Sequence, residues 1–308
     1  MDRGPRPRAA TEQEEMMAEL KGVAAAILTP FDENDNVDLE FMKKHIRFIE
    51  AGGVQGLVPS GTNGEFPSMR VEERKRVFET CAANKGGLFM VAGCAAANLA
   101  DTLELCKFAE SVGTDAIMVA PPFFFSNAPE QGIIEYYKRV FDAVSKPVFL
   151  YNIPQHTGVR ITDNIIRALE RYPHLAGVKD SSGELPSVLH YIETFPNLKI
   201  FVGDDHQALA ALTAGAAGHI TGLPNAFPRL TTELYNAFLS GKDAAQRQLR
   251  LSMARRIYSS YQEFAVNKYV LSLRGFPLRY CRLPLLDLTE AEKARFTQLM
   301  KAHGLWDL

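Results

Sequence analysis

The stretch VAAAILTPFDENDN, residues 23–36, decides between the folds open to this chain. It begins with an unbroken apolar run, which is typical of a parallel strand that is buried on both faces. The turn that follows, TPFDENDN (29–36), contains no glycine. An open, doubly wound sheet usually carries a glycine-rich dinucleotide turn at this point. The stretch therefore predicts a buried parallel strand and argues against the open sheet.

Seven further strand-like segments follow, and helical segments separate them. Asp38 is predicted to cap a helix whose apolar residues recur at helical spacing and which ends at Gly52-Gly53. Such alternation calls for a parallel sheet with right-handed crossovers, and eight units of this size predict a (β/α)8 barrel, an α/β fold. The expected strands are 23–31, 54–61, 88–94, 114–122, 147–154, 175–182, 198–205 and 218–225, with helices at 69–84, 98–112 and 129–144 among those between them.

Three regions are expected along the chain. Residues 1–20 are polar and are interpreted as a flexible N-terminal tail. Residues 21–240 hold the barrel. After residue 240 no strand-like segment follows, and residues 241–308 are expected to form a C-terminal helical appendage of about three helices.

The charge balance limits the classes of partner that this chain is expected to bind. Its 308 residues include 34 basic and 36 acidic side chains, for a formal net charge of −2 at pH 7. This balance gives no electrostatic case for nucleic acid or a membrane surface. No apolar run approaches the roughly 20 residues that cross a bilayer, and the N-terminus lacks a secretory apolar segment. The four cysteines have no paired spacing, so they fit reduced thiols, and we expect a cytoplasmic protein.

Lys179 is the first candidate functional residue. It stands near the end of the apolar run in LAGVKDSSG (175–183), at the carboxyl end of an expected strand. Barrels of this kind carry their chemistry at the carboxyl ends of the strands. One interpretation is a lysine that reaches out of the rim or pairs with Asp180. The other is a Schiff-base lysine, because desolvation in the barrel mouth disfavours the ammonium form and leaves an amine that attacks a ketone.

Two neighbouring strand ends add polar groups. Tyr151 ends the preceding expected strand, where its phenol either moves a proton beside Lys179 or only packs and hydrogen-bonds a carbonyl. In GTNGE (61–65), two glycines bracket Thr62 and Asn63, and the exposed backbone N–H groups of such a loop can hold a carboxylate.

A metal site is the alternative at this mouth, as in a zinc-dependent aldolase. Its candidate ligands have no spacing such as HxH or HxxxH. We therefore expect no metal and no organic cofactor. The candidates are His156, Asp180, Asp204, Asp205 and His206.

Four motifs occur in a fixed order along the chain, and together they resemble the dihydrodipicolinate synthase and N-acetylneuraminate lyase family over about residues 22–305. They are LTPF (28–31), GTNGE (61–65), YNIPQHTG (151–158) and GVKDSSG (177–183). The resemblance implies a TIM-barrel lyase, usually a homotetramer, whose partners are pyruvate or another 2-oxo acid and an aldehyde.

The resemblance also implies roles for individual residues. Lys179 would form the Schiff base with the 2-oxo acid, and Tyr151 would shuttle protons. Thr62 and Asn63 would hold the carboxylate, and the backbone at Ile220 would complete that pocket.

Three positions differ from the pattern of the synthases in this family. Asn63 replaces a second hydroxyl residue, Phe124 aligns with a tyrosine that completes a proton relay across a subunit contact, and His156 stands where an arginine binds the aldehyde substrate. These differences favour an aldolase that acts on a 2-oxo-3-deoxy sugar acid or a 4-hydroxy-2-oxo acid. The candidate contacts to a polyhydroxy tail are His156, Asp204, Asp205 and Asn225.

Three other functions stay open at this point. A dehydratase would use the same iminium and break a different bond, and a true dihydrodipicolinate synthase would retain the activity of the family's namesake. A non-catalytic 2-oxo acid sensor would keep the pocket while the relay decays, as the missing phenol at Phe124 suggests. Retention of both Lys179 and Tyr151 favours an enzyme.

Overall fold

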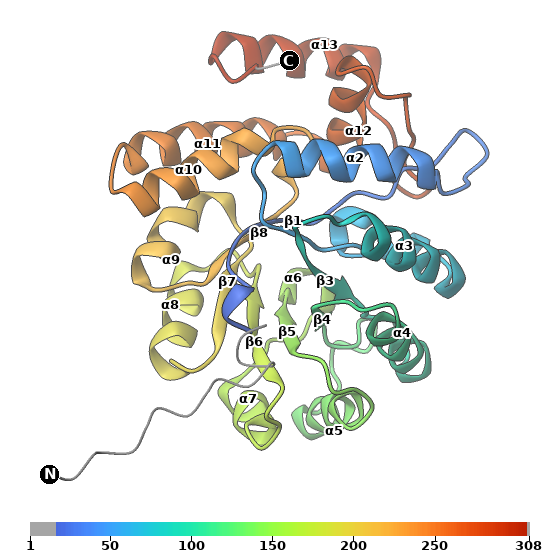
Figure 1. Ribbon diagram of the computed structural model, residues 1–308, viewed down its shortest axis with the longest axis vertical. Helices are drawn as coiled ribbons and strands as arrows, with labels where there is room; N and C mark the ends of the chain where they lie inside the picture. The colour runs from blue at the N-terminus through green and yellow to red at the C-terminus, as the bar shows by residue number, and fades with distance from the viewer. Residues whose placement is uncertain (1–16, 307–308) are drawn as a thin grey trace, which may run out of the picture.

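Eight parallel strands close into a barrel in the computed structural model, which describes residues 17–306 (Figure 1). Each strand pairs with its neighbour in sequence, and the last pairs with the first. The prediction of a (β/α)8 barrel is therefore confirmed. The strands are β1 (Gly22–Ala25), β2 (Gly56–Leu57), β3 (Phe89–Gly93), β4 (Ala116–Val119), β5 (Val148–Asn152), β6 (Leu175–Asp180), β7 (Lys199–Val202) and β8 (Gly218–Thr221).

The helices surround the strands as an outer ring (Figure 1). The predicted cap of the first of them is present, because the Asp38 side chain accepts a hydrogen bond of 2.9 Å from the backbone N–H of Phe41. The barrel helices are α2 (Leu39–Ala51), α3 (Val71–Asn84), α4 (Leu99–Ser111), α5 (Glu130–Phe141), α6 (Pro154–Thr157), α7 (Asp163–Leu169), α8 (Leu185–Thr194), α9 (Ala208–Ala214) and α10 (Pro228–Ser240).

The strands are shorter than the apolar runs that predicted them. The ladder of β1 ends at Ala25, although the run continues to Phe31. Beyond the ladder the chain stays buried, and its backbone bonds to other partners: Ile27 donates to the carbonyl of Val58, and Leu28 donates to the side chain of Asn225. Burial on all sides, rather than strand pairing, explains the length of the apolar run.

Two apolar layers hold the barrel together. Its interior is filled by large side chains, with the Phe201 ring 5.5 Å from Phe149 and 6.5 Å from Phe89 between centroids. A second and larger cluster lies between the strands and the helices. Because side chains fill the middle of the barrel, a ligand can enter only at its ends.

Three helices follow the barrel, as predicted: α11 (Ala244–Tyr258), α12 (Glu263–Leu273) and α13 (Glu290–Ala302). Their apolar side chains share one cluster with residues of the eighth barrel unit, including Phe227, Tyr258, Phe296 and Trp306. The appendage therefore has no core separate from the barrel, and its packing fixes the start of α12 beside the barrel mouth.

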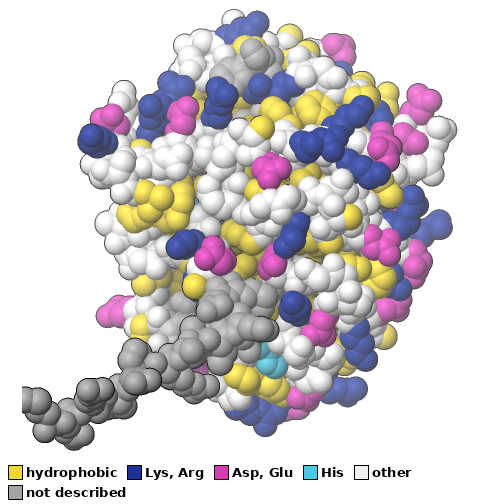
Figure 2. Space-filling view, in the orientation of Figure 1, with side chains coloured by type: hydrophobic (Ala, Val, Ile, Leu, Met, Phe, Trp, Pro, Cys, Tyr) yellow, Lys and Arg dark blue, Asp and Glu magenta, His cyan; other side chains and the backbone are white. Residues whose placement is uncertain are grey.

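The described chain begins earlier than the predicted end of the N-terminal tail. Leu20 is buried and Met17 packs against the barrel interior, so these residues belong to the fold. Residues 1–16 of the predicted tail lie outside the described residues. Across residues 17–306 we find no helix with the length and apolar character that a bilayer span requires. On the face shown in Figure 2, basic and acidic side chains are interspersed.

Candidate active site

Lys179 and Tyr151 lie side by side on β6 and β5. The strand register pairs the two residues directly, and the Lys179 Nζ lies 4.2 Å from the centroid of the Tyr151 ring. Their exposed fractions are only 5% and 6%. Of the two interpretations of Lys179, the one with the lysine outside the rim is wrong, because the side chain is buried inside the barrel mouth. An amine in such a place has lost most of its water and faces the ligand space.

Asp180 fixes the segment that follows Lys179. Its carboxylate accepts hydrogen bonds from Asn152 Nδ2 at 2.9 Å, from the Ser182 backbone N–H at 2.7 Å and from Ser187 Oγ at 2.7 Å. The Asp180 side chain is thus fully engaged and does not pair with Lys179. These bonds hold the end of β6 in place and leave the Lys179 amine to the pocket.

Thr62 and Asn63 form a short 3-10 turn, η1 (Thr62–Gly64), directly after β2. Thr62 Oγ1 lies 3.4 Å from Tyr151 Oη, so a hydroxyl meets the phenol as a relay would need. Thr29 Oγ1 anchors the turn by donating to the carbonyl of Gly64 at 2.8 Å. The predicted carboxylate loop and the predicted proton shuttle therefore lie in contact.

A buried ion pair anchors this loop from outside. Glu65 follows the turn with a left-handed backbone, φ 54°, and its carboxylate lies 2.5 Å from the ammonium of Lys268 on α12. Both side chains are essentially without solvent exposure. Burial raises the pKa of Glu65, although the Lys268 charge acts in the opposite direction. The appendage thus holds the loop that is predicted to bind the 2-oxo acid.

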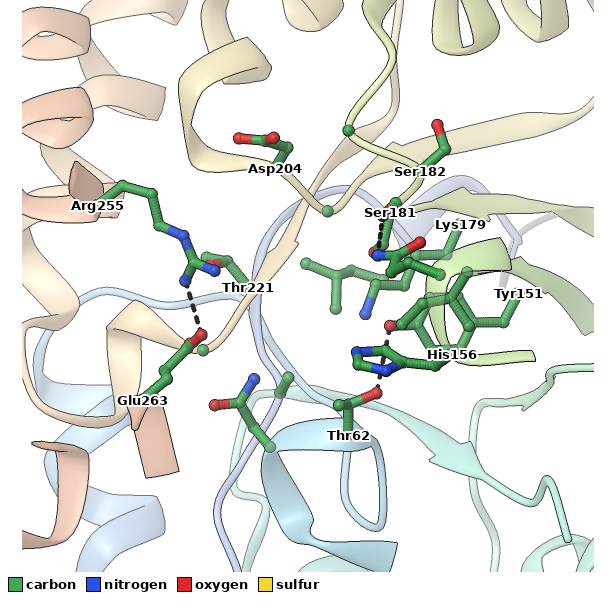
Figure 3. A pocket seen from close by; sticks show the side chains of 18 of the residues that line it. Thr62, Tyr151, His156, Lys179, Ser181, Ser182, Asp204, Thr221, Arg255 and Glu263 are labelled. Atoms are coloured by element: carbon green, nitrogen blue, oxygen red, sulfur yellow. Dashed lines mark hydrogen bonds and ion pairs between the residues drawn. The ribbon is translucent and has the colours of Figure 1, made fainter. Parts of the chain in front are cut away.

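Lys179, Tyr151 and Thr62 share a pocket of about 330 Å³ at the carboxyl ends of the strands (Figure 3). Seven of the ten predicted site residues line it. They are Thr62, Asn63, Tyr151, His156, Lys179, Asp204 and Ile220.

The other three predicted residues, Asn225, Phe124 and Asp205, do not line this pocket. Asn225 is fully buried and uses its side chain on the backbone, accepting from Leu28 and donating to Ala26 and Gly222. It closes the gap between β1 and β8 and has no free group for a substrate tail. Phe124 is 87% exposed on the β4–α5 loop, with φ 90°. Within this chain it does not contact the pocket. Asp205, another proposed tail contact, is also buried and hydrogen-bonded to Thr221 Oγ1.

Sequence reasoning missed the wall that faces Lys179. Arg255 on α11 and Glu263, the first residue of α12, line the pocket opposite Lys179 and Tyr151 (Figure 3). They form an ion pair at 2.7 Å. Burial alone would lower the pKa of Arg255, but the carboxylates of Glu263 and Asp205 outweigh burial and raise it. Neither residue follows a strand, so no pattern in the sequence assigns them to the site.

An apolar pocket of about 340 Å³ adjoins the polar one, and Tyr151 lines both. Phe66, Phe123, Phe264 and Leu285 line it, so four separate segments of the chain meet there. Within residues 17–306, no three His, Cys, Asp or Glu side chains are arranged to hold a metal ion.

Comparisons with known proteins agree with this geometry. The model of the dihydrodipicolinate synthetase family matches residues 19–303. An uncharacterised DapA-like lyase of Chloroflexus aurantiacus is 40% identical over 284 residues, which cover 90% of this chain and 95% of that protein.

Two solved structures resemble this one closely. A prophage protein of the dihydrodipicolinic acid synthase family from E. coli K12, in complex with pyruvate, has a TM-score of 0.88 at 25% identity, covering 93% of this chain and 99% of that one. A catalytic lysine mutant of the Ruminococcus gnavus sialic acid aldolase has a TM-score of 0.87 at 28% identity, covering 93% and 97%. The chain thus belongs to the dihydrodipicolinate synthetase family and is an aldolase-type lyase.

Proposed function

We propose that this protein is a class I lyase that makes or breaks the bond between pyruvate and an aldehyde through a Schiff base on Lys179. One observation carries the proposal: a buried lysine amine lies beside the Tyr151 ring, whose hydroxyl contacts Thr62, in a pocket open to ligands. The pyruvate complex of the E. coli relative and the catalytic lysine of the sialic acid aldolase support it.

The Schiff base forms in two steps. The neutral Lys179 amine attacks the C2 ketone of the 2-oxo acid, and a proton moves from nitrogen to oxygen to give a carbinolamine. The Tyr151 phenol then protonates the departing hydroxyl, so that water leaves and an iminium remains. Thr62 and Asn63 hold the substrate carboxylate through this sequence, with the Ile220 backbone beside it.

Bond cleavage uses the iminium as an electron sink. The electrons of the C3–C4 bond move into the iminium and form an enamine, while the C4 hydroxyl gives its proton to the Tyr151 oxygen and becomes the aldehyde. Tyr151 returns that proton to C3, and water hydrolyses the new iminium to release pyruvate and the Lys179 amine. Tyr151 thus moves the proton in the dehydration step, in bond cleavage and in the protonation of C3.

The substrate we propose is a 2-oxo-3-deoxy sugar acid or a 4-hydroxy-2-oxo acid. His156 and Asp204 line the pocket where the tail of such a substrate would extend. A dehydratase would form the same iminium, and its product differs. Pyruvate plus an aldehyde identifies the aldolase, a dehydrated 2-oxo acid identifies the dehydratase, and condensation of pyruvate with aspartate semialdehyde would identify a true synthase.

Borohydride trapping tests the proposal. We expect incubation with pyruvate followed by reduction to add mass to the peptide that contains Lys179. Lys268 is an internal control, because it is equally buried but paired with Glu65. Lys179→Ala should lose both the adduct and turnover. A folded wild-type protein that gains no mass on Lys179 would overturn the Schiff-base mechanism. Loss of the adduct in Lys179→Ala with unchanged biological output would indicate a sensor.

We also propose that the protein works as a cytoplasmic homotetramer. Phe124 and Phe125 expose 87% and 66% of their surface side by side on the β4–α5 loop. Two neighbouring exposed aromatic rings are typical of a protein contact. Sedimentation velocity of the wild type should give the mass of four chains, and Phe124→Asp with Phe125→Asp should give smaller species.

A further inference from the structure

The pocket wall opposite Lys179 comes from the C-terminal appendage, and it carries a fixed carboxylate. Glu263 Oε2 lies 2.7 Å from Arg255 Nη1, and this ion pair determines which way the carboxylate points (Figure 3). The Glu263 side chain is only 18% exposed. Its second oxygen, Oε1, is buried and has no hydrogen-bond partner among the described residues. One oxygen of the carboxylate is therefore held by Arg255, and the other lacks a hydrogen-bond donor among residues 17–306.

A second hydrogen-bond acceptor, on Asn63, lies close to Glu263 Oε1. Asn63 Oδ1 is also buried without a partner among the described residues. A Cβ placed on Gly222 would lie 2.2 Å from Glu263 Oε1 and 2.3 Å from Asn63 Oδ1, so the two oxygens converge over this glycine. Gly222 lines the pocket as well. Because buried acceptors without donors cost free energy, a ligand that brings a hydrogen-bond donor to this point is favoured.

The charges of this wall disfavour a second carboxylate on the ligand. Arg255 is the guanidinium that lines the pocket, and it is already paired with Glu263 and lies 3.7 Å from Asp205. Asp204 adds a further carboxylate to the lining. An anionic tail would meet these acceptors at close range, whereas an uncharged hydroxyl can donate to them.

We propose that Glu263 is a specificity-determining residue that accepts a hydrogen bond from a hydroxyl on the aldehyde-derived half of the substrate. Arg255 is its positioning residue, and Gly222 leaves the space for the hydroxyl. The enzyme thereby selects a 2-oxo acid with an uncharged, hydroxylated tail over one with a second carboxylate. This inference rests on the proposed function, since it needs the 2-oxo end of the substrate on Lys179.

Reductive trapping of three six-carbon 2-oxo acids tests the proposal without assuming which bond the enzyme breaks. The probes are 2-oxo-3-deoxygluconate with a hydroxylated tail, 2-oxoadipate with a carboxylate tail and 2-oxohexanoate with an apolar tail. The measured quantity is the concentration that half-saturates labelling of Lys179. We expect the wild type to need the least 2-oxo-3-deoxygluconate. In Glu263→Gln, the preference for it over 2-oxohexanoate should fall about 10- to 100-fold, the effect of losing one buried hydrogen bond to a charged acceptor.

The chain offers a matched control and a second variant. Glu233→Gln breaks an equivalent ion pair, Arg247–Glu233 at 2.6 Å, away from the pocket, and should keep the wild-type preference. Gly222→Ala fills the space between the two acceptors without changing a charge, and should lose the same preference as Glu263→Gln. Wild-type labelling with no preference among the tails, or a preference that survives both variants, overturns this inference alone. Wild-type protein that none of the acids labels overturns the proposed function instead.

Discussion

At the scale of single residues, the proposed chemistry depends on one phenol hydroxyl, that of Tyr151. In the proposed cycle Tyr151 moves the protons of the dehydration and cleavage steps, and its ring also packs against Lys179. Tyr151→Phe keeps the ring and removes the oxygen, so turnover should fall about 100- to 10,000-fold, the usual contribution of general acid–base catalysis. The measurement is kcat/KM for cleavage of the 2-oxo acid substrate found by the product screen.

The control for this variant is another buried tyrosine of the same barrel. Tyr137 donates its hydroxyl to the carbonyl of Val119 at 3.1 Å and does not line the pocket. Tyr137→Phe should therefore retain kcat/KM within a few-fold. If Tyr151→Phe behaves in the same way as Tyr137→Phe, the phenol does not move protons and the assignment of Tyr151 is wrong.

At the scale of elements, sequence reasoning found the pocket residues that follow a strand. It missed the pocket residues that helix packing brings to the barrel mouth. Lys179, Tyr151 and Thr62 could be found because each follows a recognisable strand, and the carboxyl ends of parallel strands meet at one mouth. Arg255 and Glu263 come from α11 and α12, whose position depends on a cluster of apolar side chains shared with α10. No local pattern encodes that placement.

Asn225 is a residue that sequence reasoning assigned to the site although its side chain is used elsewhere. It follows β8, so position alone assigned it to the site, but its amide bonds to backbone groups of three other residues. A polar residue at a strand end can serve the ligand or the barrel itself. Only the hydrogen bonds separate these two uses, and they depend on how the segment after β1 lies against the turn after β8.

The Glu65–Lys268 pair couples two elements, the loop after β2 and helix α12. Removing one partner of a buried pair leaves the other charge uncompensated, which typically costs about 3–5 kcal/mol. We expect Lys268→Met to lower the free energy of unfolding by that order, measured by urea denaturation. The double variant with Glu65→Gln should recover part of the loss, because no buried charge is left without a partner.

An exposed pair provides the comparison. Lys43 and Glu40 lie 2.6 Å apart on the surface of α2, with 36% and 77% of their side chains exposed. Surface pairs contribute about 0–1 kcal/mol, so Lys43→Met should have little effect. A Lys268→Met variant as stable as Lys43→Met would mean that the loop after β2 does not need its anchor on α12.

At the scale of the whole molecule, one buried histidine ties stability to pH. His45 on α2 is fully buried among the rings of Phe41, Phe48 and Phe276, and its Nε2–H donates to the carbonyl of Asn225 at 2.9 Å. Its Nδ1 is buried without a partner among the described residues. Protonation would place a charged donor there with no acceptor. Burial therefore lowers the pKa of His45 to about 4 from its ordinary 6.5.

This shift makes the protein less stable as the pH falls. Between the two pKa values the unfolded chain binds a proton at His45 that the folded chain does not, so stability is fully present above about pH 6.5 and is lost as the pH approaches 4. From pH 7 to pH 5 we expect a loss of about 2 kcal/mol from this group. Urea denaturation at a series of pH values measures it.

His45→Gln keeps a donor for the Asn225 carbonyl but cannot titrate, so its free energy of unfolding should change less over the same range. Subtracting the two curves removes the other titrating groups, including His174, whose pKa burial also lowers. Parallel curves for the wild type and the variant would show that His45 titrates alike in the folded and unfolded chains.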